Sequence, residues 1–405
     1  MSRFDAIDKI GGWQGFRVTR ITRLSFERLE VELRPVLNRL PLCGLCCRKV
    51  RRVHDWSVRR VRDLPAFGAQ TFLTVHLRRV QCRQCGRQSE AISWLSRYSR
   101  LTCRLSEAVV RLCDVLPIKH VSGHFGLGWD AVKRVHKRYL QALLEPIDLS
   151  GVTVLGMDEF AIQTGHRYAT VVIDMETGRV LWVGRGRGRE DVRRFFELLG
   201  PKRCRAIRAV AMNMHAAYAE EVRVYCPQAE VVYDLYHVVA KYGREVIDRV
   251  RVDEANRLRD DKEARKVVKG ARWLLLRNRS NLTRYEDRIR LQDLLAANKR
   301  LCTTYVLKDD LKHLWDYRYR GAALTFWKQW YRRAIYSKIK PLKKFARNLA
   351  QRIDGVLAHA QWHIGTSRIE GINNKIKVIK RMAYGFRDDE YFFLRICHAF
   401  PGNHG

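Results

Sequence analysis

The chain has 405 residues and carries 78 Lys and Arg against 42 Asp and Glu, which leaves a formal net charge of +36. Solubility alone does not require such a charge, and it indicates a polyanionic partner, with nucleic acid as the first choice. An anionic membrane surface is the weaker alternative, because no run of about 18 apolar residues occurs and the N-terminus lacks an apolar signal core. We therefore expect a cytoplasmic, nucleoid-associated chain of two or three domains.

Two Cys-x-x-Cys pairs lie in the first hundred residues: Cys43 and Cys46, then Cys82 and Cys85. Cytosolic cysteines seldom form disulfides, so four cysteines at this spacing predict a structural Cys₄ site for Zn²⁺. The segment between the pairs is longer than a usual zinc-ribbon loop and alternates like a strand, which predicts a hairpin or small subdomain. Cys47 is an alternative ligand, and four unlinked buried thiols are the plainer explanation.

Residues 101–145 have a helical pattern in three parts. The second helix is expected to end at Gly126-Leu127-Gly128 and the third to open at Trp129, which is typical of a helix-turn-helix. One face of the third helix is predicted to hold Trp129, Val132, Val135 and Tyr139. The other side carries the candidate DNA contacts, Lys133, Arg134, Lys137 and Arg138. A solvated basic face is the alternative.

Apolar, strand-like runs then occur at 152–157, 168–175, 180–184, 206–212 and 230–233, with helical segments at 190–199 and 215–225. Three consecutive strands followed by βαβ units predict a mixed sheet covered by helices, the ribonuclease H-like arrangement. A long helical stretch follows and carries Trp273, Trp315, Trp327 and Trp330. Such residues are more often core than a stack for an unpaired base.

These patterns predict an α/β multidomain chain in five segments. They are a zinc-binding and DNA-binding domain at 1–100, a helix-turn-helix at 101–150, the first part of a ribonuclease H-like core at 151–234, a helical insertion at 235–365, and the last core helix with a C-terminal tail at 366–405.

Two acids on widely separated segments are the candidate catalytic residues. Asp158 closes the apolar run 152–157, and Glu370 lies in a late helical segment. In a ribonuclease H-like sheet the residue after the fourth strand, Asn213, lies beside the end of the first strand, where we expect Asp158. Since Mg²⁺ or Mn²⁺ prefers hard oxygen ligands, Asp158 and Glu370 are predicted to hold metal in a two-metal site that cuts nucleic acid.

Each of these residues also has a plainer explanation. Ser367-x-x-Glu370 is a capping box, which by itself accounts for the glutamate. Asp158 and Asn213 each fit a turn at a strand end. Their joint placement on one sheet is what favours the catalytic interpretation.

Further candidates surround the two acids. Asp234 ends the fifth strand and shares a helical face with His237, so the pair is expected to support the site, to orient DNA, or only to cap the next helix. On the helix of Glu370 the candidate DNA contacts are Asn373, Asn374 and Lys377, for which ordinary helix surface is the alternative.

Together these residues match a known family. The matching stretches are the two Cys-x-x-Cys pairs, the glycine turn at 126–129, Met157-Asp158-Glu159, and the segments 233–238, 367–377 and 381–386. On them the chain resembles the DDE transposases of bacterial insertion sequences in the ISL-three group, across nearly its full length. The resemblance implies an N-terminal zinc finger, a helix-turn-helix and a ribonuclease H-like catalytic domain with a helical insertion.

Asn213 departs from the family pattern, which has the second catalytic aspartate at this position. A neutral amide oxygen bridges two cations poorly, so we expect the chain to be catalytically disabled as written. We favour an engineered change that traps a DNA complex, and a natural decayed or domesticated element is the alternative.

The resemblance implies a transposase that binds terminal inverted repeats, cuts them with Mg²⁺ and joins them to target DNA. This is polynucleotidyl transferase and endonuclease chemistry, and pairing two ends implies at least a homodimer. A non-catalytic, sequence-specific DNA-binding regulator is the second hypothesis, which Asn213 favours. A structure-specific nuclease of the same fold is the third.

Overall fold

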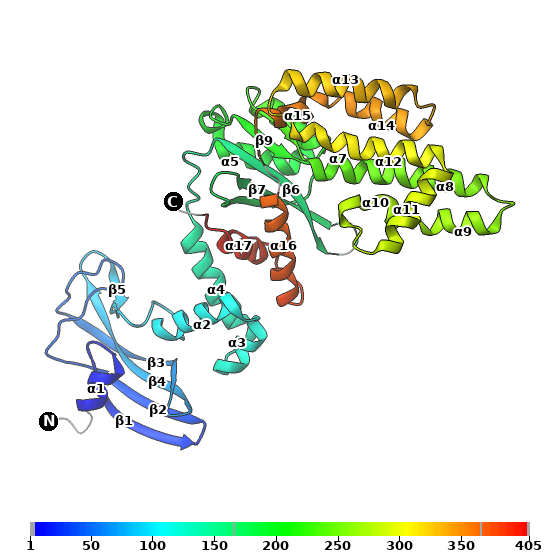
Figure 1. The fold of residues 1–405 in the computed structure, drawn as a ribbon. Helices are drawn as coiled ribbons and strands as arrows, with labels where there is room; N and C mark the ends of the chain where they lie inside the picture. Colours follow the sequence, from blue (N-terminus) through cyan, green and yellow to red (C-terminus); the bar gives the residue numbers. More distant parts are fainter. Residues whose placement is uncertain (1–4, 164, 166, 365–366, 403–405) are drawn as a thin grey trace. The chain divides into compact units, whose positions relative to one another are not determined.

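The computed structural model describes residues 5–163, 165, 167–364 and 367–402. They form two compact units, drawn in Figure 1. The first contains the chain up to Glu145 with Arg381–Phe386, and the second contains Pro146–Lys380 with the residues from Arg387 onward. Among the helices in these ranges, none combines the length and the apolar character that a membrane span requires.

A five-stranded sheet forms most of the first unit. Its elements are α1 (Asp5–Gly11), β1 (Phe16–Ser25), β2 (Arg28–Pro35), β3 (Val53–Ala66), β4 (Ala69–Cys82) and β5 (Gly86–Ser89). The strand order is β1-β2-β4-β3, with β5 on β4, and only β2 and β4 run parallel. Leu73, Val75 and Leu77 alternate along β4 and are buried on one face of the sheet. The β3–β4 hairpin is the structure predicted between the two cysteine pairs.

Three helices complete the first unit: α2 (Cys103–Val115), α3 (Ile118–Phe125) and α4 (Trp129–Leu144). Gly126 ends α3 in the left-handed region, with φ at 58°, which a residue with a side chain rarely adopts. The predicted turn between the second and third helices is therefore confirmed. Buried Asp63 of β3 accepts hydrogen bonds from Thr102 and Arg104, which join the helices to the sheet.

The second unit is built on a mixed sheet. Its strands are β6 (Val154–Gln163), β7 (Arg167–Asp174), β8 (Val180–Arg185), β9 (Ala209–Met212) and β10 (Glu230–Tyr233). They lie in the order β10-β9-β6-β7-β8, with β6, β9 and β10 parallel to one another and β6, β7 and β8 antiparallel. With α5 (Arg189–Cys204) and α6 (Ala216–Tyr225), the predicted element order and the mixed sheet are both confirmed.

Different helices cover the two faces of this sheet. Met157 belongs to a core cluster with Phe195 of α5 and Val222 of α6. On the other face lie α16 (Ser367–Met382) and α17 (Asp389–Ala399), where Phe160 meets Phe392 at 6.0 Å between ring centroids. Gly156 makes this approach possible, because a Cβ there would lie 3.0 Å from Ile369 of α16 and closer still to two neighbouring side chains. Glycine in β6 thus lets α16 cross the sheet.

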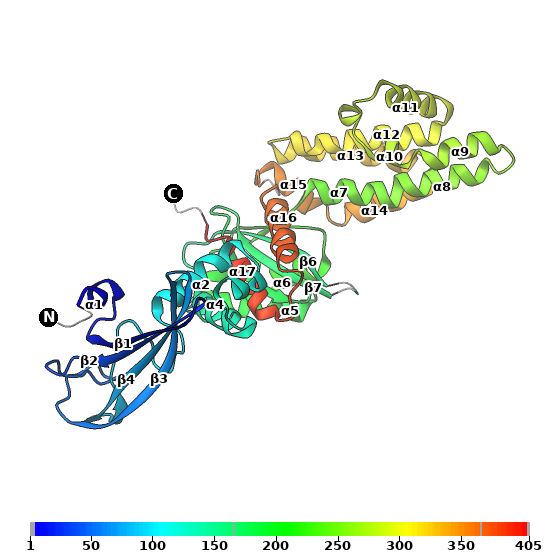
Figure 2. The same cartoon turned by 90° about the horizontal axis from the view of Figure 1, so that it is seen from below.

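A long helical segment separates β10 from α16. It contains α7 (Leu235–Tyr242), α8 (Asp248–Arg257), α9 (Lys262–Gly270), α10 (Arg272–Leu276), α11 (Tyr285–Ala297), α12 (Lys299–Lys312), α13 (Arg320–Tyr336), α14 (Lys340–Ala350) and α15 (Ile353–Leu357). Short π and 3₁₀ turns connect some of them, as at Gly243–Ile247 and His313–Asp316. Figure 2 shows α8–α14 extending away from the sheet, while α15 packs against β10. The predicted helical stretch is confirmed, with no strand among its described residues.

Candidate functional site

Three polar residues lie side by side where the parallel strands end. The β6–β9 ladder runs to the pair Met157 and Met212, and the β9–β10 ladder to Met212 and Tyr233. The next residues along these strands are Asp158, Asn213 and Asp234. They are therefore neighbours across the carboxyl edge of the parallel part of the sheet.

The expectation that Asp158 ends its strand is wrong. The strand β6 continues to Gln163, and beyond Met157 it pairs only with β7. The side chain of Asp158 still reaches the site, because alternate residues of a strand share a face. Gly156 and Phe160 face α16 and α17, so Asp158 faces them as well, and it is 9% exposed.

A cavity of about 180 Å³ brings most of the predicted residues together. Its lining includes Asp158, Asn213, Asp234, His237, Glu370, Asn373 and Lys377. The sheet is linked to α16 at this cavity, where Asn373 Nδ2 donates to Asp158 Oδ2 over 2.6 Å. Folding thus brings Asp158 and Asn373 into contact although they lie 215 positions apart in the chain.

Asn374 is the predicted α16 residue that this cavity does not include. It is exposed, and its side-chain oxygen accepts a hydrogen bond from Lys377 Nζ at 3.1 Å. The helix begins at Ser367, and Glu370 lies in its first turn. The side chain of Ser367 lies outside the described residues, so the capping-box alternative stays untested.

Asn213 presents its amide nitrogen to the acids. The backbone N–H of His215 donates to Asn213 Oδ1 over 3.0 Å, so the oxygen must face His215. The Nδ2 group then donates to Asp158 Oδ1 at 3.4 Å and to Glu159 Oε2 at 2.5 Å. Glu159 is a site residue that the sequence analysis did not single out, and its position next to Asp158 was the available signal.

Asp234 has two roles in the structure. Its Oδ1 accepts the N–H of Tyr236 at 3.0 Å and so caps α7, as one alternative foresaw. Its Oδ2 lies 2.8 Å from Nδ1 of His237. This bond raises the pKa of His237 above its ordinary value, against the opposing effect of burial. The imidazole is thus held at the site by a residue that also starts the helix.

Burial raises the pKa of Asp158 to about 6, and the neighbouring Glu159 carboxylate acts in the same direction. The positive charge of His237 partly offsets both effects. An acid with a raised pKa in a cleft is typical of a functional site. The cavity thus holds a buried acid with a raised pKa beside further side-chain oxygen atoms.

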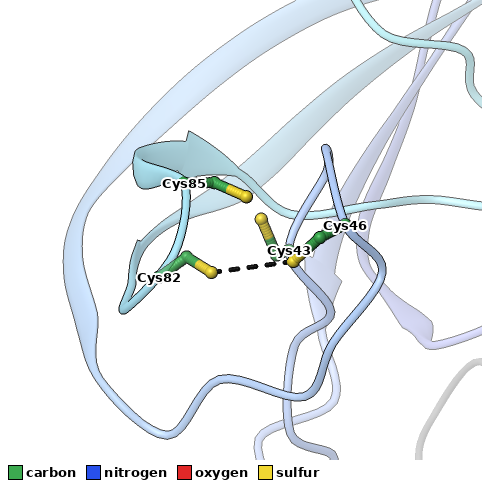
Figure 3. Close-up of side chains that lie close together, drawn as sticks. All are labelled: Cys43, Cys46, Cys82 and Cys85. Atoms are coloured by element: carbon green, nitrogen blue, oxygen red, sulfur yellow. Dashed lines mark hydrogen bonds between the residues drawn. The ribbon is translucent and has the colours of Figure 1, made fainter.

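The four predicted cysteines form a second site, in the first unit (Figure 3). The Sγ atoms of Cys43, Cys46, Cys82 and Cys85 all lie within 4.8 Å of one another. The strands of the long β3–β4 hairpin are antiparallel, so the end of β4 lies near the start of β3. This places Cys82 beside Cys46, with 3.7 Å between the sulfur atoms. Cys47 is exposed and outside the cluster, so the structure excludes this alternative ligand.

The buried residues of α4 overlap only in part with the face predicted from periodicity. Val132, His136 and Leu140 face the core at helical spacing, whereas Trp129 and Tyr139 are exposed. Of the face predicted to hold Trp129, Val132, Val135 and Tyr139, Val132 is buried and Val135 is half-buried. Arg134 and Arg138 are exposed, while Lys133 and Lys137 are half-buried. Lys133 Nζ lies 5.5 Å from the Trp129 ring centroid.

Three family models match the chain. Residues 155–396 match a transposase model of the ISL3 group, and residues 39–85 match the zinc-finger of the transposases IS204, IS1001, IS1096 and IS1165. Residues 90–140 match the helix-turn-helix domain of transposase family ISL3. The zinc-finger match spans all four clustered cysteines and supports Zn²⁺ as their ligand.

Whole-chain relatives agree with these models. The chain is 49% identical over 400 residues to the transposase for insertion sequence element IS1001 of Bordetella parapertussis, covering 98% of each chain. It is 26% identical over 392 residues to the transposase for insertion sequence element IS1557 of Mycobacterium tuberculosis, covering 90% of this chain and 86% of the relative.

Proposed function

Because the chain belongs to the ISL3 family of insertion-sequence transposases, we propose that it binds the terminal inverted repeats of its element and carries the site for Mg²⁺-dependent DNA cleavage and strand transfer. The observation that carries this proposal is the single cavity that holds Asp158, Asn213 and Glu370. These residues come from β6, the end of β9 and α16.

The catalytic domain is proposed to have the ribonuclease H-like fold. The strand order β10-β9-β6-β7-β8, with three antiparallel strands followed by two parallel ones, supports it. We divide the chain as the sequence patterns suggest, into a zinc-binding domain at 1–100, a helix-turn-helix at 101–150, the core at 151–234 and 366–405, and a helical insertion at 235–365.

Asp158 and Glu370 are proposed to hold Mg²⁺ or Mn²⁺. The donors around the cavity fit such an ion, because they are hard oxygen atoms. The buried Oδ1 atom of Asn373 also supports a cation here, because it has no hydrogen-bond partner among the described residues. When bound, such ions activate a water or a 3′-hydroxyl and stabilise the leaving oxygen. Asn373 positions the Asp158 carboxylate through its amide nitrogen.

Asn213 stands at the second catalytic position and is proposed to disable cleavage. Its Nδ2 group lies toward Asp158 and Glu159, where an aspartate would present an oxygen. An amide N–H does not bind a cation. The chain is then a transposase that still recognises DNA and cuts it poorly or not at all.

The basic side chains of α4 are proposed to contact the terminal repeats: Lys133, Arg134, Lys137 and Arg138. Asn373, Asn374 and Lys377 are proposed to approach the DNA next to the metal site, and Asp234 with His237 to support it. Synapsis of two ends requires two copies, so we propose a homodimer on DNA. The proposed location is the cytoplasm, at the nucleoid.

A DNA-binding regulator without catalysis is the second candidate function, and the amide of Asn213 is the observation that favours it. The experiment that separates the two is cleavage of oligonucleotides carrying the end of the element, with Mg²⁺, by this chain and by Asn213→Asp. Cleavage only by the aspartate variant supports a disabled transposase. Tight, specific binding without cleavage by either variant supports the regulator.

A further inference from the structure

A large groove adjoins the proposed metal site. Its volume is about 940 Å³, and it shares Asp234, Tyr236 and Glu370 with the smaller cavity. Its other walls come from α7, α10, α12 and the turn His313–Asp316, all in the second unit. Pockets of about 300–1,000 Å³ bury most of a ligand of several hundred daltons. The groove is therefore large enough for a nucleotide.

The tryptophans of the helical segment divide into two classes. Trp327 and Trp330 are buried and stack on each other with ring centroids 5.4 Å apart, as the core interpretation expects. Trp273 is 65% exposed, and it lines the groove together with half-buried Trp315. The buried indole Nε1 of Trp315 has no hydrogen-bond partner among the described residues. The groove thus offers the exposed, flat apolar ring of Trp273.

Cations line the groove together with the acids Asp234, Asp316 and Glu370. Exposed Arg244 and Arg277 line the groove with Lys312. Lys308 is 1% exposed, and its Nζ donates to the carbonyls of Leu275 at 2.9 Å and Arg277 at 3.0 Å. These bonds attach the end of α10 to α12, so the segment that carries Trp273 is held in place. Rigid support lowers the entropy lost when a ligand binds.

We infer that this groove receives an unpaired nucleotide of the bound DNA end, with the base stacked on Trp273 and the phosphate beside Arg244 and Arg277. The inference rests on the proposed function, because it requires a DNA strand at Glu370. Every base has an aromatic face, so such a stack does not depend on sequence. A base that is already unpaired, or close to a DNA end, is removed from the duplex at the lowest energetic cost.

The test compares Trp273→Ala with Tyr285→Ala. Tyr285 is a matched control, since it is 72% exposed in α11 of the same helical segment and does not line the groove. The probe is a duplex carrying the end of the element, both fully paired and with a single abasic nucleotide moved through the cleavage region. Binding is measured with the chain as it stands, because Asn213 is expected to leave the DNA uncut.

Trp273→Ala is expected to weaken binding of the paired end by about 5- to 150-fold, the range measured for removal of one stacking aromatic. At one abasic position this loss is expected to vanish, because no base remains to stack. Tyr285→Ala is expected to change neither measurement. As a second readout, 2-aminopurine at that position is expected to be quenched by the unaltered chain and bright with Trp273→Leu.

Equal affinities of Trp273→Ala and Tyr285→Ala at every position, with specific end binding retained, would overturn the inference and leave the proposed function intact. The same result is expected if a protein segment occupies the groove. If the unaltered chain shows no preference for the element's end over a scrambled duplex, the proposed function fails and the inference fails with it.

Discussion

The side-chain amide of Asn213 donates to the carboxylate of Asp158 over 3.4 Å, across the ends of two parallel strands. It also donates to Glu159, so one neutral group holds two acids that would otherwise repel each other. The N–H group of this amide therefore partly offsets the repulsion between the two carboxylates, as a bound cation would do more fully. An aspartate at 213 would reverse this, because it would add a third negative charge and remove the donor.

Asn213→Asp is therefore expected to destabilise the metal-free protein by about 1–3 kcal/mol, the loss for acids left without a donor. Mn²⁺ or Mg²⁺ is expected to restore that stability in the variant and to stabilise the parent chain less, because the parent lacks the third carboxylate. Thermal unfolding in chelator and in Mn²⁺ measures both. The double variant Asn213→Asp with Asp158→Asn serves as the control and is expected to lose the response. An identical metal response in parent and variant would contradict a metal site at 213.

The cysteine cluster predicts one zinc ion per chain. Cys82→Ser is expected to release the ion and to lower the thermal stability of the first unit, because metal binding is coupled to folding. Without metal, backbone N–H groups of Cys85 and Gln84 lower the pKa of Cys82, whereas the hydrogen bond with Cys46 raises the pKa of Cys85 to about 12. Cys47→Ser is the matched control, since its thiol is exposed and outside the cluster. Elemental analysis that finds zinc unchanged in Cys82→Ser would refute the assignment.

The exposed arginines of α4 give a salt-dependent prediction. Arg134→Ala and Arg138→Ala are each expected to weaken binding of the terminal repeat and to reduce the slope of log affinity against log salt by about 1. Arg138→Lys separates two kinds of contact, because lysine keeps a phosphate contact but loses a bidentate contact to guanine. Titrations at several salt concentrations, on repeat and scrambled DNA, provide the measurement. An unchanged slope would mean that this face is only solvated.

Lys308 gives a pH-dependent prediction. Burial lowers the pKa of its ammonium to about 8 in the folded chain, against 10.5 when unfolded. Between these values the unfolded chain binds more protons, so the free energy of unfolding is expected to rise with pH, by about 3 kcal/mol in total. Lys308→Met is expected to lack this rise. Denaturant unfolding of both proteins from pH 7 to pH 10.5 gives the difference, and parallel curves would show that Lys308 does not titrate in this range.

The elements could be predicted where local pattern determines them. The strands at 167–174, 180–185 and 230–233 and the turn at Gly126 follow from apolar periodicity and from glycine, which act over a few residues. The cysteine spacing likewise indicated the four members of the cluster. Which residues of α4 are buried was not predicted, because periodicity assigns residues to a face without showing which of them pack against other elements.

The sequence by itself determined which residue types are present: two acids, an asparagine between them in chain order, four paired cysteines and a large positive charge. Only the tertiary structure decided which of these meet. In the structure, Asp158 lies within β6 and its side chain faces α16, and Glu159 accepts a hydrogen bond from Asn213. Trp273 is exposed in a groove, whereas Trp330 is buried. The physical reason is that side-chain direction, strand register and helix crossing depend on packing between segments far apart in the chain, which no local pattern records.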